Sequence, residues 1–196
     1  MKNNVCGIGI AYNSKVAGLR ILSAPITDSD EAIALNYAFQ NTSIYSCSWG
    51  PPDDGKSMEG PSYIVKKSVV NGIQNGRGGK GSIFVFASGN GATHGDQCNF
   101  DGYTNSIYSV TVSAIDYKGL HPYYSESCAA NMIVAYSSGS GQHIVSCYFM
   151  YANDTTHSFM KVTTDVGKDK CAMTHGGTSA AAPNAVGVFA LALEAR

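Results

Sequence analysis

The sequence predicts an α/β protein with a mostly parallel sheet and helices on both faces of that sheet. Several short apolar runs are nearly continuous rather than alternating, which is typical of strands covered on both sides. Segments with apolar residues at helical spacing lie between these runs, so strands and helices alternate along the chain. The 196 residues are 44% hydrophobic and include 22 glycines, enough for one globular unit with a substantial core and many tight turns.

The predicted elements follow one another in β-α-β-α order. Residues 28–39 begin with acidic side chains and continue with apolar residues at helical spacing, which predicts a helix. Pro61 opens a second helical segment over 62–75, and Gly76 ends it. The apolar runs that predict strands are 16–22, 43–49, 83–88 and 110–115.

The pattern changes after residue 131. Short β-prone runs at 132–136, 144–149 and 158–162 are separated by turn residues, which predicts a β-rich excursion. Residues 179–194 are rich in alanine with apolar residues at helical spacing, and Pro183 falls in the first turn, where its missing N–H costs little. We predict a central, buried helix there.

Charge and composition exclude several classes of protein. A formal net charge of −1 excludes a broad basic surface for nucleic acid. The longest apolar runs are too short to span a bilayer, and the first four residues are not a signal peptide. The six cysteines lack the close spacing of a zinc site, which favours disulfides. Cys47, in an apolar strand, is predicted to be a buried free thiol, and the state of Cys147 stays open.

One serine near the C-terminus lies between a glycine-rich turn and a helix of small residues. The segment reads Thr174-His175-Gly176-Gly177-Thr178-Ser179-Ala180-Ala181-Ala182-Pro183. A serine at such a junction can present its hydroxyl to a cleft while its backbone N–H points toward a developing oxyanion. Ser179 is therefore the candidate nucleophile.

Taken with Trp49-Gly50-Pro51 and Ser88-Gly89-Asn90-Gly91, this segment resembles the subtilisin-like serine proteases, and within them the kexin and furin group of proprotein convertases. The resemblance runs over nearly the whole chain and implies a three-layer subtilisin-like fold. It implies a calcium-dependent endopeptidase that cleaves precursor proteins after paired basic residues in the secretory pathway, in the Golgi lumen or after secretion. Asn90 matches the family's oxyanion-hole asparagine, whose side-chain amide would donate beside the backbone N–H of Ser179.

The family's other catalytic motifs do not occur in this chain. Its aspartate lies in an Asp-Gly-type motif after an early strand and its histidine opens a His-Gly-Thr helix, and we expect both upstream of Met1. His175 is only four positions before Ser179, so we expect it to be a turn residue rather than the base. The interpretation is a catalytic domain over 1–196 that is truncated at both ends, with a β-rich domain downstream.

Residues 147–163 look longer than the family usually carries, as an insertion or an error in the sequence. A chain without base and orienting group is expected to be inactive alone. The alternative hypothesis is a non-catalytic binding or regulatory derivative of the fold. Sequence upstream of Met1 decides between the two hypotheses.

The resemblance also assigns residues around the substrate. Carboxylates can hold an arginine by bidentate hydrogen bonds, and an extended segment can pair with the substrate backbone. The residues implied are Asp53 and Asp101 for the primary arginine, Glu31 and Glu59 for a more distal basic position, and Ser48, Trp49 and Gly50 along the substrate backbone.

Calcium ligands and disulfides are implied in the same way. Hard oxygen ligands suit Ca²⁺. One implied calcium shell contains Asn3 with the carbonyls of Val5 and Gly7, and a second contains Asp53, Asp96 and Glu126. In the family, the counterparts of Cys6 and Cys171 form one disulfide, and those of Cys98 and Cys128 form another. The resemblance therefore implies two disulfides and an oxidising compartment.

Overall fold

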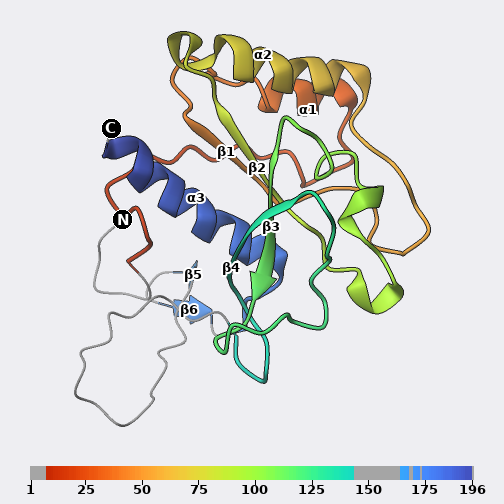
Figure 1. The fold of residues 1–196 in the computed structure, drawn as a ribbon. Coiled ribbons are helices and arrows are strands. Elements are labelled where there is room, and N and C mark those ends of the chain that lie inside the picture. Colours follow the sequence, from red (N-terminus) through yellow and green to blue (C-terminus); the bar gives the residue numbers. More distant parts are fainter. Residues whose placement is uncertain (1–7, 144–163, 168–169, 173, 196) are drawn as a thin grey trace.

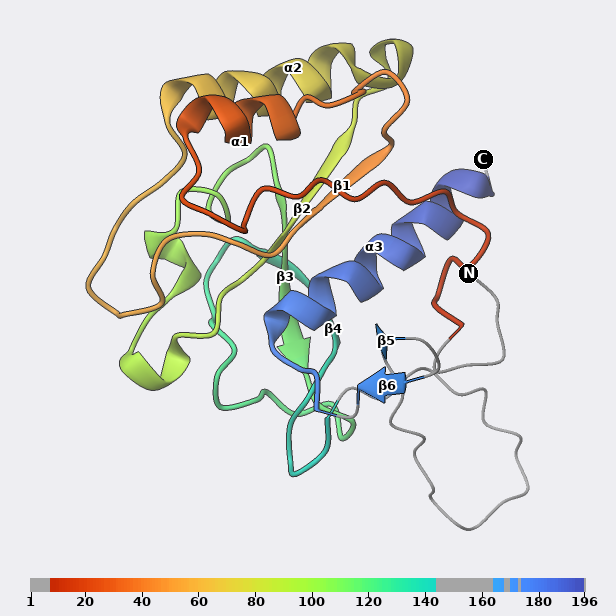
Figure 2. The same ribbon diagram turned by 180° about the vertical axis from the view of Figure 1, so that it is seen from behind.

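The computed structural model describes residues 8–143, 164–167, 170–172 and 174–195. It has three layers, with a parallel sheet in the middle (Figures 1 and 2). Helices α1 (Asp28–Ala34) and α2 (Tyr63–Gly79) cover one face, and α3 (Thr178–Glu194) crosses the other. The predicted fold class, a mostly parallel sheet with helices on both faces, is confirmed.

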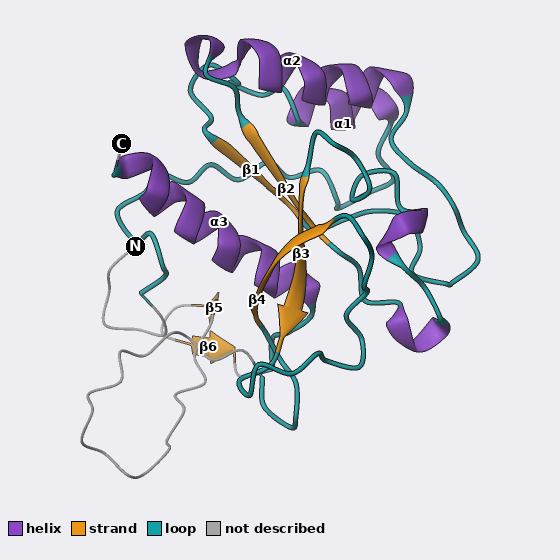
Figure 3. Ribbon diagram, in the orientation of Figure 1, coloured by secondary structure: helices purple, strands orange, loops and turns teal. Residues whose placement is uncertain are grey.

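Four strands form the sheet in the described part of the chain: β1 (Ile44–Cys47), β2 (Ile83–Ala87), β3 (Val110–Ile115) and β4 (Asn131–Tyr136) (Figure 3). They run parallel in the order β1-β2-β3-β4. The first three match the apolar runs predicted for the sheet, and β4 matches the β-prone run at 132–136. Because the strands are parallel, their carboxyl ends lie at one edge of the sheet, where the loops after each strand can form a common site.

Alternate side chains of the strands supply two separate cores. Phe84 and Phe86 of β2 face α1 and α2, where they pack with Leu35 and Val65. Val85, between them, belongs to the core under α3. Both faces of β2 are therefore buried, which explains its continuous apolar run.

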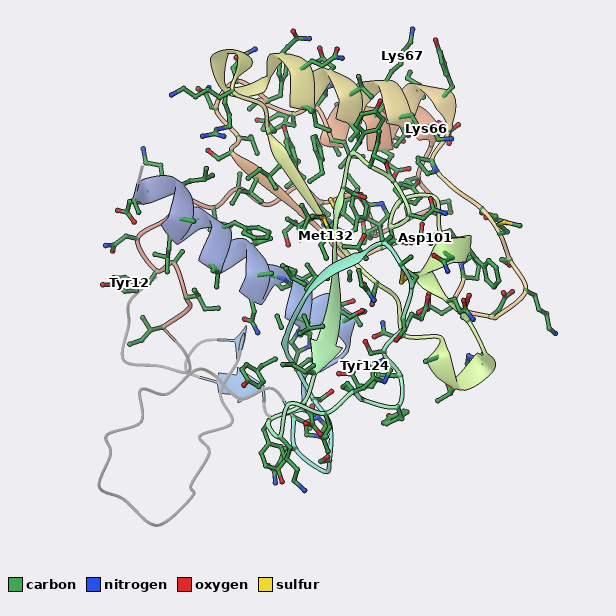
Figure 4. The ribbon with its side chains drawn as sticks, viewed as in Figure 1. Tyr12, Lys66, Lys67, Asp101, Tyr124 and Met132 are labelled. Carbon is green, nitrogen blue, oxygen red and sulfur yellow. A yellow bond between two sulfur atoms is a disulfide. The ribbon has the colours of Figure 1, made fainter. Side chains whose placement is uncertain are left out.

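Residues in the sequence mark where α1 begins and where α2 ends. Thr27 and Asp30 form a capping box, in which each residue binds the backbone N–H of the other. In α2 the backbone leaves helical geometry at Gly76, as predicted. Lys66 and Lys67 are exposed on this helix, and Lys67 Nζ lies 4.7 Å from the centre of the Tyr63 ring (Figure 4).

Helix α3 packs closely because its sheet-facing side is made of small residues. Ala181, Ala182 and Ala185 are buried against Val112 and Ala114 of β3. Pro183 is the sixth residue of the helix, one turn further in than predicted, because the helix begins at Thr178. Because these side chains are short, the helix axis can lie close to the strands. This packing fixes the helix on the sheet, and with it the position of its first turn.

Two predicted elements differ from the structure. Residues 16–22 do not form a strand, and Val16 is 92% exposed. An apolar run indicates burial, but a strand also needs a neighbour for its backbone groups, and the described sheet ends at β1. The helix predicted over residues 28–39 is shorter in the structure. Helix α1 ends at Ala34, and turns follow it.

The β-rich excursion is also corrected. Residues 132–136 belong to β4 of the main sheet, with Ile133 and Ala135 against α3 and Met132, Val134 and Tyr136 exposed on the other face (Figure 4). A small antiparallel pair that was not predicted, β5 (Thr164–Gly167) and β6 (Lys170–Ala172), precedes α3. The predicted runs at 144–149 and 158–162 and the insertion at 147–163 lie outside the described residues.

The cysteine predictions are met where the structure describes them. Cys98 and Cys128 form a disulfide, with Sγ atoms 2.07 Å and Cα atoms 5.4 Å apart. Cys47 is a buried free thiol, and burial raises its pKa far above the usual value. Cys6, Cys147 and the side chain of Cys171 lie outside the described residues. None of the helices described is long and apolar enough to cross a membrane.

Candidate functional site

The turn before α3 places Ser179 in the first helical turn. Gly177 is the N-cap, with φ 83° and ψ 170°, a conformation that favours glycine. The first N–H groups of a helix have no partner within the helix, and the helix dipole makes this end positive. Ser179 is half-buried there, so its hydroxyl and its N–H lie at a boundary between the core and solvent.

Asn90 reaches the same turn from the end of β2. Its Oδ1 accepts hydrogen bonds from the Thr178 N–H at 2.8 Å and from the Thr178 hydroxyl at 3.1 Å. With the side-chain oxygen bound in this way, the two Nδ2 hydrogens are directed to other partners. The backbone N–H of Asn90 donates to Asp53 Oδ2 at 2.8 Å. Asn90 is thus held against the residue that precedes Ser179.

The end of β1 contributes a third contact. The hydroxyl of Ser48 donates to the Ser179 carbonyl oxygen at 3.3 Å. Ser48 and Gly50 are exposed. Segments that follow β1 and β2 therefore meet at the start of α3, although they are far apart in the sequence.

A pocket next to this turn is lined by four carboxylates. The pKa of Asp101 is raised to about 6, mainly by burial and to a smaller extent by the nearby charge of Asp53. Burial raises the pKa of Glu126 to about 7, with further contributions from Asp53, Asp96 and Asp101. The lining residues are Pro51, Pro52, Asp53, Ser57, Ser88, Asp96, Gln97, Phe100, Asp101 and Glu126. Among the described residues this lining has no Lys or Arg, so the pocket is suited to a cation.

Glycines allow these carboxylates to approach one another. A Cβ atom at Gly91 would lie 2.7 Å from the Cβ of Asp96 and 2.9 Å from that of Asp53. The Gly91 N–H donates to Glu126 Oε1 at 2.8 Å, and the Gly55 N–H donates to Asp96 Oδ2 at 3.0 Å. In the described part of the chain, no three His, Cys, Asp or Glu side chains are arranged as they would be around a metal ion.

The two glutamates assigned to a distal position differ in exposure. Glu31 is 6% exposed, and its two oxygens accept hydrogen bonds from Trp49 Nε1 and the Tyr103 hydroxyl, each at 3.0 Å. Glu59 is exposed, and its carbonyl accepts the Gly102 N–H at 2.8 Å. Glu31 therefore orients the Trp49 and Tyr103 side chains, while Glu59 is exposed to solvent.

The remaining predicted residues are placed as follows. Asp101 is half-buried beside Gly50, where an added Cβ would lie 2.9 Å from Asp101 Oδ2. His175 is exposed in the turn before α3. Asn3, Val5 and Gly7 lie outside the described residues.

Two residues of this site were not predicted. Thr178 lies inside the serine motif, and its N–H and hydroxyl fix the Asn90 side chain. Tyr103 is two positions after Asp101, and its ring packs 5.4 Å from that of Phe86. The adjacency of Thr178 to Ser179 was an available signal. The contact of Tyr103 with Glu31, 72 residues away, was not.

Comparison with known proteins matches the whole chain to one family. The model of the family described as "Subtilase family" matches residues 1–196. The chain is 60% identical to Kexin of Candida albicans (strain WO-1) over 195 residues, 55% identical to Kexin of Saccharomyces cerevisiae, and 45% identical to Furin of Bos taurus. These matches cover 98% or more of the chain but only 19% to 22% of the relatives, so the chain spans about one fifth of their length.

Solved structures show the same fold at low identity. A serine protease of Aeromonas sobria matches with a TM-score of 0.72 at 19% identity, over 95% of this chain and 37% of the protease chain. A cold-adapted subtilisin-like serine proteinase matches with a TM-score of 0.64 at 21% identity, over 96% of this chain and 56% of the other. At these identities the likeness concerns the fold alone.

Proposed function

The chain belongs to the subtilase family, and from that premise we propose that it carries the nucleophile and oxyanion hole of a kexin-type serine endopeptidase. The proposed substrates are precursor proteins cleaved after paired basic residues. The observation that carries the proposal is the contact between Asn90 Oδ1 and Thr178, which holds a side-chain amide at the helix start that bears Ser179. This contact supports an oxyanion hole in which the Asn90 amide and the Ser179 N–H would be the two donors beside the Ser179 hydroxyl.

The proposed reaction is an acyl transfer. The Ser179 hydroxyl attacks the substrate carbonyl, and the oxyanion accepts hydrogen bonds from the Ser179 N–H and from Asn90 Nδ2. A serine protease also needs a base that takes the hydroxyl proton and a group that orients this base. The family's motifs for these two groups do not occur within residues 1–196, so each activity test below uses the complete gene product.

We assign arginine recognition to Asp53 and Asp101. Both line the acidic pocket, and Asp101 lies against Gly50, on the segment proposed to pair with the substrate. A guanidinium in the pocket would form charge-assisted hydrogen bonds and offset the mutual repulsion of the carboxylates. Trp49, held by Glu31, forms a rigid wall beside them. Glu59, which is exposed, is proposed to meet the more distal basic residue.

The preference for arginine at the cleavage position should depend on Asp53 and Asp101. In the complete gene product, Asp53→Asn with Asp101→Asn is expected to lower the preference for arginine over alanine at the cleavage position by about 100-fold or more, because each desolvated charge pair contributes several kcal/mol. Asparagine keeps an oxygen for the Asn90 N–H, so the site should stay assembled. The measurement is kcat/KM on a matched pair of peptides, with the rate of Ser179 labelling by a fluorophosphonate as the check on the nucleophile.

Asp54→Asn is the matched control for that experiment. Asp54 lies in the same loop, but its carboxylate accepts the N–H groups of Lys56 and Ser57 and does not line the pocket. It should leave the arginine preference within twofold of the wild-type value. An unchanged arginine preference in the double variant would show that Asp53 and Asp101 do not recognise the arginine.

We also propose that Asp53, Asp96 and Glu126 supply ligands to a calcium ion. Their carboxylates are hard oxygen donors, they line one pocket, and Glu126 carries the raised pKa of a buried acid among other acids. The side chains alone do not surround a point in the structure. A bound Ca²⁺ would neutralise this cluster and stabilise the loops that carry it.

The second prediction concerns that ion. Millimolar Ca²⁺ is expected to raise the melting temperature of the complete gene product, since a ligand at 100 times its Kd adds about 2.7 kcal/mol to the free energy of unfolding. Glu126→Gln removes a buried charge and keeps the acceptor for Gly91, so without calcium it should melt above wild type at pH 8 and gain less from Ca²⁺. Differential scanning calorimetry with Ca²⁺ or a chelator measures both effects.

The control for the calcium experiment is Glu194→Gln, at the exposed end of α3. It should gain as much from Ca²⁺ as wild type does. An equal Ca²⁺ gain in Glu126→Gln and wild type would show that Glu126 is not a ligand.

The compartment we propose is the secretory pathway, in the Golgi lumen or outside the cell. The Cys98–Cys128 disulfide supports it, because such bonds persist in oxidising compartments. The second candidate function, a non-catalytic binding derivative of the fold, predicts that the complete gene product binds dibasic peptides without cleaving them. Incubation with such a peptide followed by mass spectrometry distinguishes the two functions.

A further inference from the structure

We infer that Ser137 and Ser138, which follow β4, are positioning residues that fix the turn carrying Ser179. The inference rests on the proposed function for its catalytic consequence. The Ser137 hydroxyl donates to the Gly177 carbonyl oxygen at 2.7 Å, and the Ser138 hydroxyl accepts the Gly177 N–H at 3.4 Å. Two adjacent serines thus bind both backbone groups of the N-cap residue of α3.

Tyr124 supports the second of these serines. Its hydroxyl donates to the Ser138 carbonyl oxygen at 2.7 Å and accepts from the Ser138 hydroxyl at 3.2 Å. Tyr124 is 8% exposed and packs in the core under α3, with Val112 and Ala181. The restraint on Gly177 is therefore anchored in the hydrophobic core (Figure 4).

The turn needs such a restraint from outside. Gly176 and Gly177 have no side chains, and glycine loses more conformational freedom on folding than any other residue. A Cβ atom at Gly176 would collide with the Ser138 hydroxyl, so the close approach of the two segments requires glycine there. Because Gly176 and Gly177 have no side chains, the turn can lie close to Ser138. For the same reason, the contacts that fix the turn come from Ser137 and Ser138.

Three strand ends then hold three successive residues. The segment after β4 holds Gly177, Asn90 after β2 holds Thr178, and Ser48 after β1 holds the Ser179 carbonyl. Ser137 is 2% exposed, so it acts through Gly177 and does not touch substrate. Its role is to set where the Ser179 hydroxyl and N–H point, and a displacement of about 1 Å at such a site can cost about 100-fold in rate.

The experiment compares Ser137→Ala and Tyr124→Phe with Ser82→Ala in the complete gene product. Ser82 is a matched control, because it is 5% exposed and its hydroxyl donates to the Thr42 carbonyl at 2.9 Å, at the opposite end of β2. All three variants lose one buried hydroxyl and should lose similar stability. Ser137→Ala is expected to lower kcat and the rate of fluorophosphonate labelling at least tenfold with KM within twofold, and Tyr124→Phe at least threefold. Ser82→Ala should leave kcat within twofold.

Amide hydrogen exchange of peptides that contain residues 176–182 supplies a readout that does not depend on catalysis. Exchange should become faster in Ser137→Ala and Tyr124→Phe and stay unchanged in Ser82→Ala. If the complete gene product cleaves no peptide, the proposed function fails, while this faster exchange still establishes the restraint. Unchanged exchange and unchanged kcat in both site variants would overturn the inference, as would an equal loss of kcat in Ser82→Ala.

Discussion

Ser179→Ala in the complete gene product should abolish cleavage of a dibasic peptide. Removal of the nucleophile of subtilisin lowers kcat by about a millionfold, and we expect a loss of that size here. The structure explains why the effect should be confined to chemistry. Ser179 is half-buried at the start of α3, and its carbonyl, which Ser48 binds, is retained in alanine. Helix propensity even favours alanine at this position.

The measurements for this variant are kcat on a dibasic peptide, labelling by a fluorophosphonate and the melting temperature with and without Ca²⁺. Labelling should disappear, and the melting temperature and its calcium response should stay close to those of wild type. Ser106→Ala, an exchange of a serine outside the site, controls for the loss of a hydroxyl. Cleavage by Ser179→Ala at the wild-type rate would exclude Ser179 as nucleophile, and with it the proposed function.

Asn90→Asp should have the second largest effect, a loss of about 100- to 1000-fold in kcat. That is the loss caused by removing the corresponding amide of subtilisin, about 2.7–4 kcal/mol of transition-state stabilisation. Aspartate keeps an oxygen that Thr178 can donate to, so the turn before α3 should stay in place. It replaces the Nδ2 donor by an oxygen, which cannot donate to the oxyanion and repels it when ionised.

KM and the melting temperature separate this effect from misfolding. Both should change little in Asn90→Asp, since the amide acts on the transition state rather than on the bound substrate. Asn71→Asp is the control, because Asn71 is half-buried like Asn90 but lies on α2, where its Nδ2 donates to Asn36 Oδ1 at 2.8 Å. If Asn90→Asp lost no more kcat than Asn71→Asp, Asn90 would not belong to an oxyanion hole.

The parts of the fold that could be predicted are those with a clear local signal. Strand β2 is covered on both faces and shows a continuous apolar run, β3 is buried on both faces with only Thr111 and Ser113 polar, and α3 has alanines at the positions that meet the sheet. Residues 16–22 have a similar apolar run and form no strand, because hydrogen bonding between strands depends on neighbours that a local pattern does not reveal. The β-prone run 132–136 does form a strand, β4, but it belongs to the main sheet rather than to a separate excursion; only one of its faces is covered, so it lacks the continuous apolar run of a central strand.

In the candidate site, too, only the residues with a local sequence signal could be predicted. Ser179 and Asn90 stand in short motifs whose neighbours are fixed by turn geometry, so they could be named from the sequence. The acids of the pocket could be named only through the family resemblance, because Asp53 and Glu126 are 73 positions apart in the chain. The hydroxyls of Tyr103, Thr178 and Ser137 were missed, since each acts through a partner on another element.

Helix α2 has a consequence for an enzyme that cuts after paired basic residues. Lys66-Lys67 is such a pair, and both side chains are exposed to solvent. A protease binds its substrate as an extended strand, whereas this pair is wound into a helix whose Lys66 N–H donates to the Ser62 carbonyl at 2.9 Å. Val65 and Val69, on either side of the pair, are anchored in the core and oppose unwinding. On the proposed function, the folded domain would resist cleavage at this pair by other copies of the enzyme, whereas an unfolded molecule would expose the pair to them.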